Sequence, residues 1–227
     1  MHLIIANKLY SSWSMRPWLV MTAFDIAFEE TVIPLRREQT SEKIRAFSPS
    51  GKVPVLIDGE ITVWESLAVI EYLAEKFPEK AIWPQSTEAR ACARSICAEM
   101  ASGFLPLRKA CPMNLGKRFA PKSWDGDVMA SVDRVKELWR RTRAEFAGDG
   151  AFLFGDFTAA DAMYAPVASR LATYGFELDD DTEAYTQAVF AHPAFEKWTA
   201  QALVEPWTIA DYEEGHTPLE VFSCTSA

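Results

Sequence analysis

A serine-rich stretch near the start of the chain decides the fold, namely Tyr10-Ser11-Ser12-Trp13-Ser14-Met15-Arg16-Pro17-Trp18. It follows an apolar run over residues 3–6 and opens a mostly apolar stretch over residues 19–28. This order is typical of a strand that turns into a helix. Serines in such a turn lie beside a helix N-terminus, where free backbone N–H groups and the helix dipole stabilise negative charge. The turn is suited to holding an anion such as a thiolate, although the turn alone is better read as an ordinary helix cap at Ser14.

A second informative segment lies further along the chain, over residues 48–73. It places Val53-Pro54 before a strand pattern and Glu65-Ser66 before a helix pattern. Each dipeptide alone is common, but at this spacing, together with the serine turn, they are specific. The combination resembles the N-terminal domain of cytosolic glutathione S-transferases. The resemblance is clearest over residues 1–80 and can be followed to about residue 205.

The coarse pattern of residues 1–80 predicts the order β-α-β-α-β-β-α, which is the thioredoxin-like layout. Asp58-Gly59 is a strong turn signal between the third and fourth strands. The expected strands cover residues 3–7, 30–35, 53–57 and 60–63, and the expected helices cover residues 14–28, 41–47 and 66–77.

After a linker over residues 78–87, the pattern of residues 88–227 is helical throughout and predicts an all-α C-terminal domain. A long helix is expected over residues 87–107, with Pro106 marking an end or a kink. Residues 114–126 read as loop, and residues from about 211 to 227 as an extended tail. The other expected helices cover residues 127–146, 158–174, 183–190 and 193–204.

Composition describes an ordinary water-soluble chain of 227 residues, 49% hydrophobic and 24% charged. The net charge of −9 argues against nucleic acid or an anionic membrane as a partner. No apolar run reaches the ~20 residues that span a bilayer, and no N-terminal signal is visible. The cysteines form no C-x-x-C pair and have no nearby histidines, so we expect free thiols, no metal and a cytoplasmic location. The four cysteines are Cys92, Cys97, Cys111 and Cys224.

The resemblance implies that one hydroxyl of the turn donates a hydrogen bond to the glutathione sulfur. Registering Met15-Arg16 on the family's usual helix start puts Ser11 in the catalytic position, with Ser12 and Ser14 as alternates. Tyr10 is a further candidate, because other classes use a tyrosine nearby, but it reads better as a core aromatic. No cysteine stands in the turn, so thiol–disulfide exchange through a mixed disulfide is not expected there.

The second segment is expected to bind the rest of glutathione. The resemblance implies a cis Val53-Pro54 bond, with the Val53 backbone pairing with the cysteinyl unit and Lys52 offering a cation to the glycyl carboxylate. Ser66 is expected to cap its helix and, with nearby N–H groups, to hold the γ-glutamyl carboxylate. Glu65 is then free to pair with the γ-glutamyl ammonium.

Other signals in the helical half are structural. Thr158 and Asp161 have capping-box spacing, so Asp161 should support folding. His192-Pro193 reads as a helix start, and Asp179–Asp181 as solvated charge. The second substrate is expected between the domains, where Met100, Phe104, Leu107, Arg108 and Trp124 are candidates for lining it, although such residues more often form core.

The sequence thus predicts a glutathione S-transferase that activates glutathione as a thiolate for attack on a small hydrophobic electrophile, and it favours thiolate activation over reduction. The resemblance also implies a homodimer. Two alternatives stay open. One is a non-catalytic protein that binds glutathione or a hydrophobic ligand. The other is a zeta-like maleylacetoacetate isomerase, since Ser11-Ser12 resembles that motif, but Trp13 stands where the motif has cysteine.

Overall fold

A computed structural model describes residues 1–222. Its N-terminal half holds a four-stranded sheet in the order β2-β1-β3-β4. The strands are β1 (His2–Ala6), β2 (Glu29–Ile33), β3 (Val55–Asp58) and β4 (Ile61–Trp64). β1 pairs in parallel with β2 and antiparallel with β3, and β3 and β4 form the predicted hairpin.

The apolar run that precedes the serine turn forms the centre of this sheet. Leu3, Ile4, Ile5 and Ala6 are completely buried, as expected for a central strand that is covered on both faces. Three helices belong to the same half, and together with the strands they give the predicted thioredoxin-like order. They are α1 (Ser12–Ala23), α2 (Thr40–Arg45) and α3 (Ser66–Lys76).

The predicted helix over residues 14–28 is wrong at both ends. Ser11 rather than Ser14 is the N-cap residue of α1, so the helix begins two residues earlier. It ends at Ala23. Asp25 adopts a left-handed conformation, with φ of 49°, and a right-handed helix cannot continue through a residue in that conformation. All three serines of the turn therefore lie at the first turn of α1 or directly before it.

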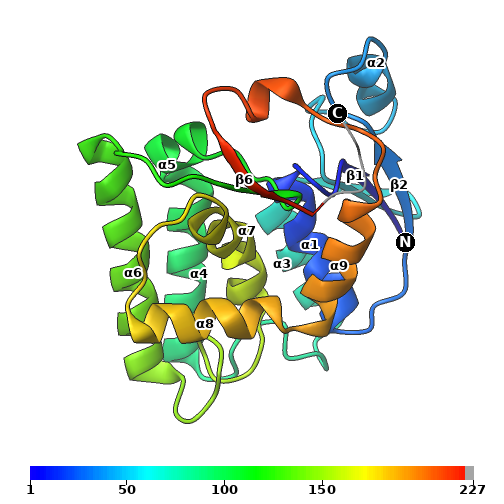
Figure 1. The fold of residues 1–227 in the computed structure, drawn as a ribbon. Coiled ribbons are helices and arrows are strands. Elements are labelled where there is room, and N and C mark those ends of the chain that lie inside the picture. Colours follow the sequence, from blue (N-terminus) through cyan, green and yellow to red (C-terminus); the bar gives the residue numbers. More distant parts are fainter. Residues whose placement is uncertain (223–227) are drawn as a thin grey trace.

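The C-terminal half is built mainly of helices, as predicted. Figure 1 shows α8 running across the ends of its neighbours on the side away from β6. The helices are α4 (Thr87–Ser102), α5 (Leu105–Ala110), α6 (Gly126–Phe146), α7 (Ala159–Thr173), α8 (Asp180–Phe190) and α9 (Pro193–Leu203). The division at residues 80–88 remains a prediction.

The predicted helix over residues 87–107 is in fact two helices, and the break precedes Pro106. α4 ends at Gly103, where an added Cβ would lie 2.7 Å from the carbonyl oxygen of Glu99. Phe104 then takes a left-handed conformation, and Pro106 falls in the first turn of α5, where its missing N–H costs little.

The extended tail predicted from residue 211 is also corrected. A short 3-10 helix, η1 (Ala210–Tyr212), precedes β6 (Pro218–Val221), which pairs with β5 (Lys117–Phe119) inside the region that was predicted to be loop. In Figure 1 this orange-to-red segment leaves α9, passes the sheet and returns as β6. Sequence separation hid the pairing, since neither strand shows a pattern of its own. Residues 223–227 of the predicted tail lie outside the described part, and Cys224 with them.

Candidate functional site

A cavity of about 520 Å³ lies between the two halves of the chain, where the second substrate was expected. The serine turn and the loop before β3 form one wall, and α5, α7 and η1 contribute the other. Its lining residues are Tyr10, Ser11, Ser12, Trp13, Leu35, Ile44, Gly51, Lys52, Val53, Leu105, Arg108, Lys109, Pro112, Met113, Arg170 and Tyr212.

The three serines of the turn have different surroundings. Ser14 is completely buried, lies outside the cavity lining, and accepts a hydrogen bond from the backbone N–H of Ala6 at 3.1 Å. The Ser11 hydroxyl donates to Ser14 Oγ at 2.8 Å. Ser12 Oγ accepts a hydrogen bond from Arg170 Nη2 at 3.1 Å. Ser11 and Ser12 line the cavity at the start of α1, whereas Ser14 lies behind the cavity wall and accepts the hydrogen bond from Ser11.

Two of the four predicted residues of the second segment also reach the cavity. Lys52 and Val53 line it, and the Val53–Pro54 peptide bond is cis, as expected. Ser48 fixes the loop before them, because its hydroxyl donates to the carbonyl oxygen of Lys52 at 2.6 Å. Gly51, with φ of 67°, makes the turn that brings Lys52 to the cavity.

Glu65 and Ser66 do not line this cavity, and the predicted cap at Ser66 is wrong. Glu65 is the N-cap residue of α3, with φ of 69°, and Ser66 is the first helical residue. The Ser66 hydroxyl is buried and donates to the carbonyl oxygen of Trp13 at 2.7 Å. Its proton is therefore used to join the start of α3 to the serine turn, and Glu65 is left exposed beside that junction.

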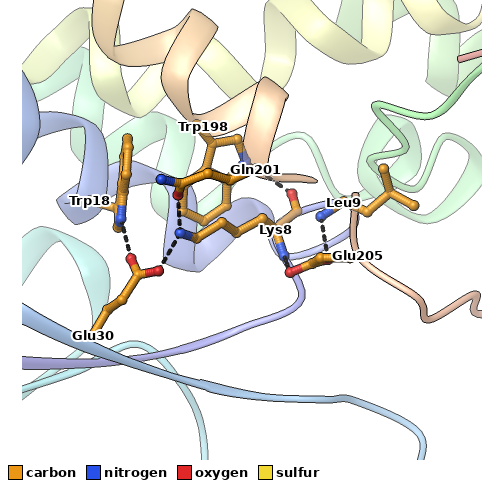
Figure 2. Close-up of polar contacts among 7 residues, drawn as sticks. All are labelled: Lys8, Leu9, Trp18, Glu30, Trp198, Gln201 and Glu205. Carbon is orange, nitrogen blue, oxygen red and sulfur yellow. Dashed lines mark hydrogen bonds and ion pairs between the residues drawn. The ribbon is translucent and has the colours of Figure 1, made fainter. Parts of the chain in front are cut away.

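Figure 2 shows how the chain directly before the serine turn is held. The Glu205 carboxylate, just beyond α9, accepts the backbone N–H groups of Lys8 and Leu9 at 2.8 and 3.1 Å. The buried Lys8 side chain pairs with Glu30 at 2.5 Å and contacts Gln201, and it lies over the rings of Trp18 and Trp198. Burial raises the pKa of Glu205 although these N–H groups oppose the shift. These contacts fix the turn against both β2 and the C-terminal half.

The chain after α9 closes the cavity from the C-terminal side. Tyr212 lines it, and Glu213 accepts hydrogen bonds from Tyr10 Oη at 3.0 Å and from Asn114 and Lys117. Burial, followed by Glu213, raises the pKa of Tyr10 well above its usual value, which is the opposite of what a hydroxyl that ionises at neutral pH would need. Tyr10 packs in a buried cluster with Leu9, Ala202 and Ile209, as the sequence suggested, and it also lines the cavity.

Sequence reasoning missed several lining residues. Arg170 carried a readable signal, since it is a cation within the otherwise apolar stretch of α7. Tyr212 and Lys109 carried none. Of the five candidates for lining proposed from the sequence, only Arg108 lines the cavity, while Met100 and Leu107 are fully buried in the core.

The structural signals in the helical half are as predicted. Thr158 and Asp161 form a capping box at the start of α7, and Asp161 is completely buried. His192 is the N-cap residue of α9, and its Nδ1 accepts from Ala194 N. Asp179 does more than carry solvated charge, because it caps α8 by accepting from Thr182 N.

Comparison with known proteins identifies the family to which this fold belongs. A family model described as glutathione S-transferase, N-terminal domain, matches residues 10–76, and one described as glutathione S-transferase, C-terminal domain, matches residues 115–200. The chain belongs to the glutathione S-transferase family. A probable maleylacetoacetate isomerase of Caenorhabditis elegans is 38% identical over 75% of this chain and 81% of the relative. Rat maleylacetoacetate isomerase is 39% identical over 74% and 76%.

Solved structures share the family fold. A glutathione transferase homologue from Burkholderia, with bound glutathione, aligns at a TM-score of 0.68 and 24% identity, over 88% of this chain and 97% of the other. A maleyl pyruvate isomerase, described as a bacterial zeta-class member, aligns at 0.69 and 21%, over 92% and 100%. At these identities the likeness concerns the fold.

Within residues 1–222, no helix is long and apolar enough to cross a membrane, and no group of three or more histidine, cysteine or acidic side chains could hold a metal ion. Cys92, Cys97 and Cys111 are free thiols.

Proposed function

We propose that this glutathione S-transferase family member is a glutathione-dependent enzyme that stabilises the glutathione thiolate at Ser11 and directs it at a small electrophile. The observation that carries the proposal is the pair of serine hydroxyls on the cavity wall at the start of α1. Glutathione would supply the nucleophilic sulfur. The family membership and the relatives' names support the coarser part of this proposal, a glutathione-dependent enzyme.

The chain's own groups account for thiolate formation. A free thiol has a pKa near 8.5, so only a few per cent is ionised at neutral pH. A hydroxyl donor and the free N–H groups of a helix start favour the thiolate, and each unit of lowering corresponds to about 1.4 kcal/mol. Ser11 fits this role because it lines the cavity and can turn its proton from Ser14 to a ligand. Ser12 stays as the alternate. Ser14 is disfavoured as the catalytic residue because it is completely buried.

The remaining predicted residues would bind the rest of the tripeptide. The Val53 backbone and Lys52 line the cavity on the side of the sheet. Glu65 is exposed for the γ-glutamyl ammonium, and the N–H groups at the start of α3 are placed for a carboxylate. Because the Ser66 hydroxyl donates to Trp13, we assign Ser66 a backbone contact and a role in holding the turn.

Isomerisation is the second candidate reaction, and the two maleylacetoacetate isomerases at 38% and 39% identity favour it. Against a close match, Trp13 occupies the position of the cysteine in the zeta-like turn. A non-catalytic binding protein is the rival from another class.

The cysteines fit a cytoplasmic location, because a reducing compartment keeps thiols free. Family membership suggests a homodimer, which size-exclusion chromatography with light scattering would test.

The decisive experiment is an ultraviolet titration of thiolate absorbance with glutathione from pH 5 to 9. We expect thiolate that depends on the protein, with a lowered apparent pKa. Binding without a thiolate signal would favour the binding protein, and no binding would refute the proposal. Turnover of maleylacetoacetate compared with a chlorinated aromatic acceptor then separates isomerisation from conjugation.

A further inference from the structure

A second cavity, of about 220 Å³, lies in the helical half between α7 and α9, and we call it the α7–α9 cavity. α7 contributes Ser169 and Thr173 to its wall, whereas Arg170 between them lines the first cavity. The other walls come from α9, the end of α8 and the ribbon that β5 and β6 form. No residue within 1–222 lines both cavities, so a ligand held here would not take part in chemistry at the serine turn.

The walls of the α7–α9 cavity are mainly apolar. Phe190 and Phe195 pack with ring centres 5.0 Å apart, and Leu115, Leu203 and Phe222 complete the apolar lining. A closed apolar cavity of about 150 Å³ takes a benzene ring, whereas pockets for larger ligands have about 300 Å³ or more. The volume therefore suits a compound of one or two aromatic rings, and it is too small for glutathione or a glutathione conjugate.

One wall of the α7–α9 cavity carries a cation without a counter-ion. Arg118 of β5 is half-buried, and its guanidinium lies 5.8 Å from the centre of the Phe222 ring. Glu220 stands opposite Arg118 on β6, but within residues 1–222 no ion pair involves Arg118. None of the lining residues is Asp or Glu. Arg118 is thus an unpaired cation beside an apolar space.

A second polar group in the same wall also lacks a partner. The Thr199 Oγ1 atom, on α9, is buried and forms no hydrogen bond within residues 1–222. Ser169 and Thr173 differ, because their hydroxyls donate to the carbonyl oxygens of Pro166 and Asn114, each at 2.9 Å. Burial of a polar group without a hydrogen bond is unfavourable. Thr199 and Arg118 therefore both favour a ligand that brings an acceptor.

We propose that the α7–α9 cavity binds a small aromatic monoanion, with its rings against the apolar wall and its charged group at Arg118 and Thr199. A planar guanidinium suits an anionic group with two or more oxygens, such as a sulfonate or a carboxylate. The ligand is neither glutathione nor its electrophile, so the site stands whichever reaction the first cavity performs. A two-stranded ribbon is only marginally stable by itself, so a ligand bound against β5 and β6 should also stabilise them.

The test measures binding while the first cavity is filled. The full chain is saturated with S-hexylglutathione and titrated calorimetrically with 2-naphthalenesulfonate and with the uncharged 2-naphthol. We expect the sulfonate to bind about tenfold more tightly than 2-naphthol, as a charge-assisted hydrogen bond provides. Arg118→Gln should remove that preference, and Thr199→Val should weaken sulfonate binding severalfold. Arg141→Gln, at an exposed position of α6 outside both cavities, should leave binding unchanged.

Hydrogen exchange locates the bound sulfonate independently, because it should slow exchange of the β5 and β6 amides and leave that of the serine turn unchanged. Four results would overturn the assignment: no sulfonate binding in the presence of S-hexylglutathione, an unchanged preference in Arg118→Gln, loss of sulfonate binding in Arg108→Gln, or protection of the serine turn instead of the ribbon. Each of the last two would mean that the anion binds in the first cavity. Failure of the proposed function is seen separately, as absence of the thiolate signal.

Discussion

Arg170 Nη2 donates a hydrogen bond to Ser12 Oγ at 3.1 Å, and this contact joins α7 in the helical half to the first turn of α1. Because the Ser12 oxygen accepts this bond, its own hydroxyl proton is available for another acceptor. The Ser11 proton, in contrast, is directed at Ser14. The two serines that line the cavity are thus prepared differently, and a variant series can tell which of them holds the sulfur.

We predict that Ser11→Ala lowers the glutathione-dependent rate about 100-fold, the cost of removing one donor from a developing or full negative charge. The apparent pKa of bound glutathione should rise by about one unit or more, while glutathione affinity is kept. Ser12→Ala is the matched control and should have the smaller effect. Thiolate absorbance against pH measures the apparent pKa of bound glutathione in both variants. A larger rise in Ser12→Ala would transfer the role to Ser12.

Glu65→Gln should weaken glutathione binding with little change in the rate at saturation. The exposed carboxylate would pair with the γ-glutamyl ammonium, which is far from the sulfur, so its loss should raise KM about tenfold and leave kcat within about twofold. Glu60→Gln, exposed in the turn between β3 and β4, is the control. A fall in kcat without a change in KM would contradict this role for Glu65.

Glu205→Gln should loosen the chain before the serine turn. In the wild type, one carboxylate oxygen of Glu205 accepts from the Lys8 N–H and the other accepts from the Leu9 N–H. The amide of the variant has only one accepting oxygen. We expect the free energy of unfolding to fall by about 2 kcal/mol. Urea unfolding measures it, with the exposed Glu196→Gln on α9 as the control, which should change by less than about 0.5 kcal/mol. Equal stabilities would show that Glu205 does not hold the turn.

The sequence was most informative where a local pattern has one physical solution. The apolar run over residues 3–6, the Asp58-Gly59 turn and the Thr158–Asp161 capping box each specify their own structure, and each is present. Helix ends were less predictable. The end of α1 depends on the left-handed Asp25, and the break between α4 and α5 on Gly103 and Phe104, and neither conformation has a reliable signal in the residue type.

Several contacts between distant residues had no signal in the sequence. The pairing of β5 with β6, the Glu205 contacts with Lys8 and Leu9, and the approach of Arg170 to Ser12 join segments that only the tertiary fold brings together. The same limit explains the error at Ser66. Its residue type suits a cap, but the proximity of the Trp13 carbonyl gives its hydroxyl a different partner.

Asp161 provides the last prediction, which concerns stability and its dependence on pH. Its carboxylate accepts the backbone N–H groups of Leu153 and Thr158 at 3.0 and 2.8 Å, together with the hydroxyls of Thr158 and Tyr185. Asp161→Asn places an amide N–H₂ against these donors, so we expect the free energy of unfolding at pH 7.5, where the carboxylate is ionised, to fall by about 3 kcal/mol. Urea unfolding measures this loss. The folded fraction should keep its glutathione-dependent rate, because Asp161 is not part of the cavity wall.

The difference between wild type and Asp161→Asn should also shrink as pH rises. Burial raises the pKa of Asp161 to about 6 despite its hydrogen bonds, whereas an aspartate in the unfolded chain titrates near 4. The folded protein therefore binds this proton more tightly, so its contribution to stability is complete below about pH 4 and is lost as pH rises through 6. Two units correspond to about 3 kcal/mol. Urea unfolding at pH 4 and 7.5 measures the change, and the exposed Asp156→Asn should show no such trend. A difference that stays constant between the two pH values would mean that the Asp161 pKa is not raised in the folded protein.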